Sequence, residues 1–540
     1  SYPSVLSHIL YTNTKNGGNG MELETKVIHK NKMPIEVMSQ LIAEEDYNLP
    51  EYKPDIKYVI KSHGNIVVEE VVPEEEYVSV KGKMQFAILY QGEGGESLVD
   101  QVNGSISFTE RLHAEGAMRS ENVTVRTQME DLGVVVINSR KLSLRGLANV
   151  TVCICEGVEL ELPLYCEYPA EYQVQKEERR ILKYVEGRGD RLRFKQEVTL
   201  PKEKPDIHML LWQDVRLEQM SIRQNNEGVE IAGMLYLFAL YETGQEEKYA
   251  WYETSLPVSA QMECDIPLTD GFFLVKQVRT QTMLEPREDL DGELRNLAAE
   301  CSMEVELFIW QEEEIALLQD AYCMARELHV HRHEEELWQV AMKNEALFTA
   351  EGRQTISAGK EVLYLCDTQS QVHLQEVHLQ GGNIAIKGVC EVEVLYATAG
   401  ETQPFANERM TIPFAGEIEA GNVREGDYID AEARVYRTQS SMADAMALQC
   451  RVESQVTIMA FERNRLQIPD DLVEEPLDLE KLQKEPGMIG YVVQEGDDLW
   501  SIAKHFHTTR QELMETNDLT QETLQKGQKL LVMKHIYLMS

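Results

Sequence analysis

The sequence predicts a mainly β protein with three β-rich repeat domains in series and a small C-terminal α+β domain of βααβ order. Three observations predict this fold. Short runs of Val, Ile, Leu, Tyr and Phe alternate with polar residues at the period of half-buried strands. One pattern of residues occurs three times, and helical spacing of apolar residues is scarce before the C-terminal region. The 540 residues also exceed what one hydrophobic core usually organises.

The first twenty residues differ from the acidic, strand-patterned sequence that begins at Met21. They end in a cluster of Asn and Gly, which favours a flexible coil. Codons for Gly17 and Gly18 can contain the purine-rich core of a bacterial ribosome-binding site, a short distance before the Met21 codon. We therefore expect translation to start at Met21, which makes residues 1–20 a mis-called leader. The alternative is a genuine disordered tail.

The three repeats are marked by a Gly that is followed eight residues later by a Tyr, at Gly82, Gly233 and Gly388. Upstream, Lys-Pro-Asp-Ile occurs at 53–56 and 204–207, whereas the third copy has Gly-Lys-Glu-Val at 359–362. These landmarks divide the chain into repeats at 21–160, 161–315 and 316–468. An acidic, Pro-containing linker is expected at 469–489, before a domain at 490–535.

Downstream of each repeat glycine, an Arg-Thr-Gln sequence begins at Arg126, Arg279 and Arg437. A residue that the fold requires should recur in the copies, whereas a unique functional site need not recur. We therefore predict a structural role for the Arg-Thr-Gln and Lys-Pro-Asp sequences.

The charge of the chain argues against nucleic acid as its main partner. Lys and Arg number 52 and Asp and Glu number 92, so the net charge is −40, which repels phosphate backbones and anionic lipid surfaces. No apolar run is long enough to form a transmembrane segment, and no signal peptide is recognisable, so we expect a cytoplasmic protein. Nine cysteines without a CxxC pair indicate neither a disulfide framework nor a zinc ribbon.

Two clusters have a spacing that a metal site could use. Cys153 and Cys155 face the same side of a predicted strand, but buried structural cysteines are the preferred interpretation. His329, His331 and His333 also share one strand face, and the matching positions of the preceding copy are merely polar. We favour a solvated strand face over a zinc site. P-loop, HExxH, GxSxG and dinucleotide-binding patterns are absent from the sequence, so we expect no enzymatic activity, no cofactor and no metal.

The C-terminal region has the element order of a compact βααβ domain. A strand at 491–493 is followed by a turn at Gly496 and by a helix that Asp497 or Asp498 caps. Apolar residues with helical spacing give this helix one buried face. Thr509 and Glu512 form a capping box for a second helix, which is predicted to end at Asn517, and the strand at 529–533 returns. The residues of the buried face are Leu499, Ile502, Ala503 and Phe506.

This region closely resembles a LysM domain, through YVVQEGDDLWSIAKHF, the turn at 517–519 and the Gly-Gln-Lys-Leu sequence at 527–530. The resemblance implies a shallow groove that binds N-acetylglucosamine-containing glycans. Carried over by position, one side of the groove has Gly496, Asp497, Asp498, Leu499 and Trp500, and the other has Asn517, Asp518 and Leu519. Gly496 and Leu499 also have structural roles. Trp500 is the best contact candidate as an exposed aromatic; the alternative is that it only covers the core between the helices.

The upstream repeats resemble SPOCS domains, the β-rich repeats of bacterial spore-coat proteins, through LPEYKPDI, LPKEKPDI and the strand from the repeat glycine to Leu-Tyr. The combination is similar to SPOCS and LysM sporulation proteins of clostridia. It implies a non-enzymatic scaffold that binds a spore coat morphogenetic ATPase (SpoIVA-like) at the forespore surface, in the mother-cell cytoplasm. The alternative is a wall or cortex protein that binds peptidoglycan glycans, and a weaker one is a metal-dependent enzyme that uses the histidine strand.

Overall fold

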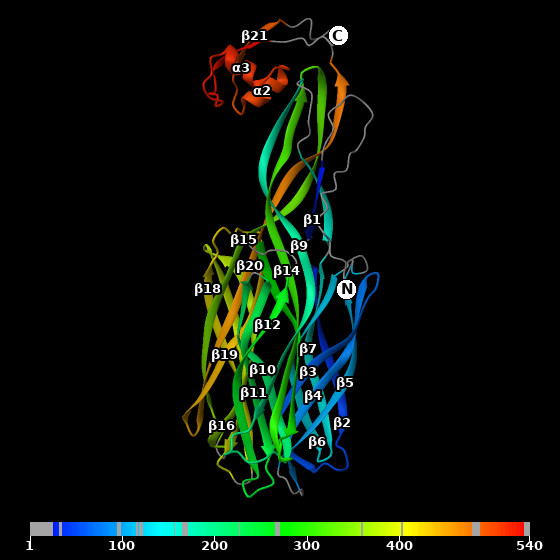
Figure 1. Ribbon diagram of the computed structural model, residues 1–540, viewed down its shortest axis with the longest axis vertical. Coiled ribbons are helices and arrows are strands. Elements are labelled where there is room, and N and C mark those ends of the chain that lie inside the picture. The colour runs from blue at the N-terminus through cyan, green and yellow to red at the C-terminus, as the bar shows by residue number, and fades with distance from the viewer. Residues whose placement is uncertain are drawn as a thin grey trace.

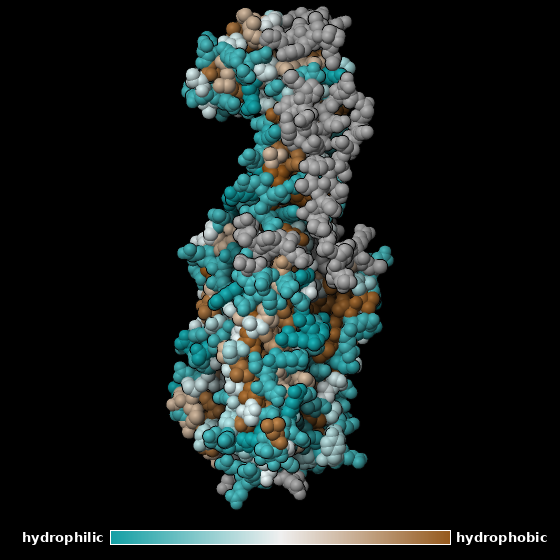
Figure 2. Space-filling model, in the orientation of Figure 1, coloured by the Kyte–Doolittle hydropathy of each residue, from teal (hydrophilic) through white to brown (hydrophobic). Residues whose placement is uncertain are grey.

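The computed structural model describes residues 25–31, 35–93, 99–114, 117, 122–155, 157–164, 171–225, 227–264, 271–357, 360–400, 403–477 and 486–533. The predicted leader at 1–20 and Cys166 lie outside these residues, as does the side chain of Cys155. Figure 1 shows three β-rich units side by side, a narrower arm of long strands that rises from them, and the C-terminal domain at the far end of the arm. Polar residues cover most of the described surface in the view of Figure 2, in keeping with the net charge of −40.

Each repeat folds into two three-stranded antiparallel sheets. The chain enters one sheet, forms the second sheet as a three-stranded meander, and returns to complete the first. In the first repeat the sheets have the orders β2-β7-β6 and β3-β4-β5. Their strands are β2 (Ile35–Asn48), β3 (Asp55–Pro73), β4 (Tyr77–Glu93), β5 (Val99–His113), β6 (Asn122–Asn138) and β7 (Lys141–Cys155).

The second and third repeats have the same topology, so the mainly β prediction is confirmed. Their sheets have the orders β9-β14-β13, β10-β11-β12, β15-β20-β19 and β16-β17-β18. The second repeat contains β9 (Tyr172–Thr199), β10 (Met209–Asn225), β11 (Gly228–Glu242), β12 (Tyr249–Glu263), β13 (Gly271–Glu288) and β14 (Leu294–Cys323). The third contains β15 (Arg326–Thr355), β16 (Val362–Gln380), β17 (Asn383–Thr398), β18 (Phe405–Glu419), β19 (Tyr428–Asp444) and β20 (Ala447–Pro476).

A shared core joins the three repeats, in addition to the core that each repeat has between its own sheets. Leu89, Leu240 and Leu395 stand at the same distance after the repeat glycine, and all three are fully buried in the shared core. The meander sheets therefore have two buried faces, one toward their own partner sheet and one toward the other repeats. The repeats follow one another in sequence, but in space they pack around a common centre.

The repeat glycine recurs because two groups approach its backbone closely. A side chain at Gly82 would place its Cβ 2.3 Å from the carbonyl oxygen of Val67, and one at Gly388 would lie 2.6 Å from that of His373. The rings of Phe108 and Phe414 cover these same glycines from the neighbouring strands. Only glycine leaves room for both contacts.

The repeat tyrosine and the Lys-Pro-Asp sequence form one structural unit. The Tyr90 hydroxyl donates a hydrogen bond to the Pro54 carbonyl at 3.2 Å, and Tyr241 donates in the same way to Pro205 at 3.1 Å. In the third repeat, which lacks this proline, the buried Tyr396 hydroxyl has no hydrogen-bond partner among the described residues.

The aspartate of the same sequence holds an arginine at the start of the returning strand. Asp55 pairs with Arg140 at 2.7 Å, and the guanidinium also donates to the Lys53 and Pro50 carbonyls. Asp206 pairs with Arg295 in the equivalent place of the second repeat. These contacts tie the start of the meander to the other sheet, which supports the structural role predicted for Lys-Pro-Asp.

The arm consists of the outer halves of four long strands. β9 pairs with β14 up to Tyr172 and Cys323, and β15 pairs with β20 up to Arg326 and Pro476. The short strands β1 (Thr25–Asn31) and β8 (Gly157–Pro163) pair with each other and join the arm through a small apolar core. That core contains Ile28, Leu160, Leu162, Ile181, Ile315, Leu317, Leu337 and Ile468.

Two expected boundaries require correction. Residues 469–476 were assigned to the linker, but they continue β20 and pair with β15. Ile468 is buried, Leu472 packs in the arm, and Pro469 and Pro476 stand at a register shift and at the strand end, where the ladder does not need their N–H groups. The second and third repeats meet at the turn between β14 and β15, not at residue 315.

The C-terminal domain has the predicted βααβ order, with β21 (Met488–Val492), α2 (Leu499–His505), α3 (Arg510–Thr516) and β22 (Lys529–Met533). Asp498 is the N-cap of α2, Thr509 and Glu512 form the capping box of α3, and Asn517 is its C-cap, as predicted. No helix in the described part of the chain has the length and apolarity that a membrane crossing requires.

Candidate functional site

The loop before α2 is held in place by its own carboxylates. Gly496 is exposed and has a φ of +93°, a conformation that favours glycine. The Asp497 carboxylate accepts hydrogen bonds from the Gln494 N–H and the Tyr491 hydroxyl, both at 2.7 Å, and these two bonds lower its pKa. Asp498 accepts a hydrogen bond from the Ser501 N–H at 2.7 Å as the helix cap. These residues therefore shape the loop, and Gly496 and Asp498 remain exposed.

The loop after α3 is fixed by Asn517. Its side-chain nitrogen donates to the Leu513 and Leu531 carbonyls at 2.8 Å, and its oxygen accepts from the Leu531 N–H at 2.6 Å. Asp518 follows with a φ of +48° and an exposed side chain, and Leu519 packs partly buried against the domain core. An ion pair of 2.5 Å between Lys526 and Glu495 links the two loop regions. Of this side of the predicted groove, Asp518 is the residue most available to a ligand.

Leu499 and Trp500 are both buried, with 2% and 7% of their surface exposed. The expectation of an exposed aromatic at Trp500 is wrong for this chain, because the ring packs on the arm. It makes an edge-to-face contact with Tyr322 at a centroid distance of 4.9 Å, and its Nε1 donates to Asp320 Oδ2 at 2.8 Å. Asp320 lies 180 residues away in the sequence, so no local pattern could reveal this contact.

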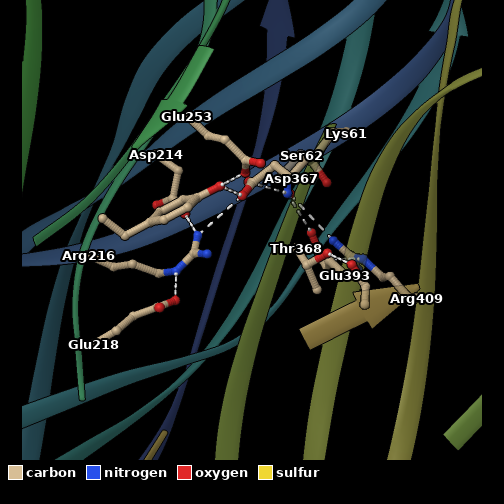
Figure 3. Close-up of polar contacts among 12 residues, drawn as sticks. Lys61, Ser62, Asp214, Arg216, Glu218, Glu253, Asp367, Thr368, Glu393 and Arg409 are labelled. Carbon is tan, nitrogen blue, oxygen red and sulfur yellow. Dashed lines mark hydrogen bonds and ion pairs between the residues drawn. The ribbon is translucent and has the colours of Figure 1, made fainter. Parts of the chain in front are cut away.

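A second cluster, which the sequence analysis did not identify, lies where the repeats meet. Lys61, Trp212 and Asp367 each stand 21 residues before the repeat glycine and pair with the three central leucines. The Lys61 Nζ lies 4.0 Å from Asp367, 3.6 Å from Glu393 and 5.7 Å from the centre of the Trp212 ring. Figure 3 shows how Lys61 of the first repeat converges with Asp367 and Glu393 of the third. One equivalent position therefore carries a cation in the first repeat, an aromatic in the second and an anion in the third. This pattern in the sequence could have indicated the cluster.

Opposite charges neutralise most of this cluster. Asp367 accepts a hydrogen bond from Arg216 at 3.3 Å (Figure 3). It also accepts one from the Tyr236 hydroxyl at 3.2 Å. Burial and the neighbouring Asp214 carboxylate raise the pKa of Asp367. Burial also acts to raise the pKa of Asp214, but Arg216 and a hydrogen bond from Gln369 outweigh it and lower that pKa. Perturbed carboxylates often mark catalytic sites. Here Asp214 pairs with Arg216 of its own strand β10, whereas Asp367 faces Arg216 of the second repeat and Lys61 of the first, which fits a role in joining the repeats.

A cavity of about 290 Å³ lies beside this cluster, between the first and third repeats. Its lining mixes polar and apolar residues and includes His63. Arg409 pairs across the cavity with Asp131 at 2.9 Å and with Glu393 at 2.5 Å. The pair with Asp131 joins the third repeat to the first, whereas Glu393 belongs to the third repeat, like Arg409 itself.

The metal candidates have ordinary structural surroundings. Cys153 is buried in β7, as preferred. His329 and His331 are exposed on β15, and the nearest carboxylates to His329 and His333 are Glu475 at 3.8 Å and Asp470 at 3.3 Å. Within the described ranges, no three or more His, Cys, Asp or Glu side chains are grouped so that they could hold a metal ion.

Comparison with known proteins agrees with the two kinds of domain. A LysM domain model matches residues 491–532, and the model of the SipL SPOCS domain matches residues 55–137 and 361–443. These segments lie in the C-terminal domain and in the first and third repeats, and the second repeat has the same strand order. Comparisons with curated proteins and with solved structures give no match. In its domain content, two SipL-type SPOCS domains and one LysM domain, the chain matches a SPOCS/LysM sporulation protein like SipL.

Proposed function

We propose that this protein is a non-enzymatic scaffold of spore coat morphogenesis, whose LysM domain binds a coat protein at the forespore surface. The partner in this proposal is a SpoIVA-like coat ATPase, and the place is the mother-cell cytoplasm. The observation that carries the proposal is the combination of SipL-type SPOCS domains with a LysM domain. The arm supports it further, since it holds the LysM domain away from the three repeats (Figure 1).

The LysM loops offer the partner a small polar surface. Gly496, Asp498 and Asp518 are exposed, and the carboxylates and Asn517 fix the loops before any ligand arrives. A preformed surface binds with a lower cost in conformational entropy. LysM domains also suggest glycan binding, so the second candidate function is recognition of N-acetylglucosamine-containing peptidoglycan through the same loops.

The test compares the two ligands directly. The purified full chain and a version that lacks residues 486–533 are measured for binding to the coat ATPase and to chitin oligomers. We expect the ATPase to bind only the full chain. Tight binding of chitin oligomers without affinity for the ATPase would favour the glycan alternative and contradict the scaffold proposal.

A loop variant then tests the surface itself. Asp518→Asn removes the exposed charge, and Asn tolerates the positive φ of this position. We expect weaker ATPase binding with an unchanged melting temperature. Glu515→Gln is the matched control, because Glu515 is also exposed and acidic but lies on α3.

A further inference from the structure

The LysM domain contacts the end of the arm through a short segment of its own sequence, residues 500–508. The arm presents Asp320 and Tyr322 near the end of β14, two residues apart and therefore on one face of the strand. Tyr322 is almost completely buried, and it belongs to the hydrophobic core of the LysM domain. An arm side chain thus forms part of the hydrophobic core of the LysM domain.

Two groups of α2 recognise the Asp320 carboxylate. The Trp500 Nε1 donates to Oδ2 at 2.8 Å, and the Lys504 Nζ donates to both carboxylate oxygens at 2.8 Å. Trp500 and Lys504 are four residues apart, so they lie side by side on one face of the helix. The arm itself contributes Arg332 at 3.0 Å. Hydrogen bonds with an ionised partner are about twice as strong as neutral ones, so the carboxylate is a strong determinant of this contact.

Two other features recognise the tyrosine. Its ring stands edge to face on the Trp500 indole, and its hydroxyl donates to the Thr508 carbonyl at 2.7 Å. The Arg510 guanidinium lies 5.5 Å from the centre of the Trp500 ring and helps to fix that ring in place. Burial raises the pKa of Tyr322, so the hydroxyl keeps the proton that it donates. A Phe at this position would lose the bond to Thr508.

We infer that this LysM surface is a receptor for an extended protein segment that carries a carboxylate and a tyrosine two residues apart. The arm occupies the receptor within the same chain, so a partner segment of this chemistry would bind by displacing the arm. The inference rests on the proposed function in one respect, that the LysM domain binds a protein. It adds the recognition chemistry of that partner and a surface distinct from the exposed loops at 496–498 and 517–519.

The test uses a labelled peptide with the sequence of residues 316–324, in which Cys323 is replaced by Ser. It is titrated into the full chain with Asp320→Ala and Tyr322→Ala, which empties the receptor, and into the wild-type chain. We expect the double variant to bind the peptide, and the wild type to bind it at least about tenfold more weakly, because a tethered competitor has a high effective concentration. Adding Lys504→Glu to the double variant should abolish binding.

The controls separate recognition from misfolding. Circular dichroism and melting establish that each variant is folded, and Asp320→Asn, which removes only the charge, replaces the double variant if the latter is unfolded. Peptides with Asp320→Asn or Tyr322→Phe should each bind more weakly than the parent peptide. A folded arm variant that binds no peptide, or binding that survives Lys504→Glu, would overturn the inference. Because the coat ATPase is not used, failure here is distinguishable from failure of the proposed function.

Discussion

The three repeat tyrosines allow the contribution of one hydrogen bond to stability to be measured within a single chain, because two of them make the bond and the third does not. Tyr90, Tyr241 and Tyr396 occupy equivalent positions and are all fully buried. The first two donate to a proline carbonyl, whereas the third has no partner among the described residues. The perturbation is Tyr→Phe at each position in turn, which removes the hydroxyl and little else.

The structure sets the expected magnitudes. A typical hydrogen bond contributes a net 0.5 to 1.5 kcal/mol, so Tyr90→Phe and Tyr241→Phe should each lower the free energy of unfolding by about 1 kcal/mol. Burial raises the pKa of Tyr241 to about 12, so its hydroxyl stays protonated and able to donate near neutral pH. Tyr396→Phe removes a buried hydroxyl that has no hydrogen-bond partner in the described part of the chain, so stability should stay the same or rise by up to about 1 kcal/mol.

Urea denaturation followed by circular dichroism measures these differences. The midpoints should shift while the slope m stays constant, since the substitutions hardly change the surface exposed on unfolding. The third repeat is the natural control, because it has Gly-Lys-Glu-Val where the other two have Lys-Pro-Asp-Ile. Equal losses of stability in all three variants would contradict this role of the proline bond, since the hydroxyl of Tyr396 would then stabilise the fold without it.

Two further predictions concern the contacts between repeats. Lys61→Met leaves Asp367 with less compensation and should cost about 3 kcal/mol in urea denaturation, and adding Asp367→Leu should recover part of that loss. Arg279→Ala removes a 3.0 Å hydrogen bond to the Val68 carbonyl of the first repeat and the ion pair with Glu304, and should lower the free energy of unfolding by about 2 kcal/mol. Arg437 occupies the equivalent position in the third repeat but is exposed, so Arg437→Ala should lower it by less than about 0.5 kcal/mol. Thermal melting of both variants measures the difference.

Features that depend on neighbours in sequence could be predicted from the sequence. The caps at Asp498 and Thr509 and the helix end at Asn517 follow from side chains that bond the backbone three or four residues away. The repeats were evident because the same close backbone approach at Gly82 and Gly388 demands the same residue each time. Alternation of polar and apolar residues identified strands, since each strand has faces of different burial.

The position of the linker could not be predicted in the same way. Three prolines and many carboxylates made 469–489 resemble a connector, yet β20 continues to Pro476 because a partner strand, β15, is present to pair with it. A strand is stabilised by the strand beside it, and β15 lies more than a hundred residues earlier in the sequence. Composition alone therefore favoured a loop.

Local patterns along the chain were sufficient to predict the βααβ module and the motifs that each repeat needs for its own fold. The tertiary structure decided which surfaces remain free. Trp500 has the sequence setting of an exposed groove residue, but Asp320 and Tyr322 cover it from the arm. Lys61 and Asp367 become partners because three meander sheets meet at one place. Such contacts join residues hundreds of positions apart, and they form only because packing brings buried polar groups within reach of one another.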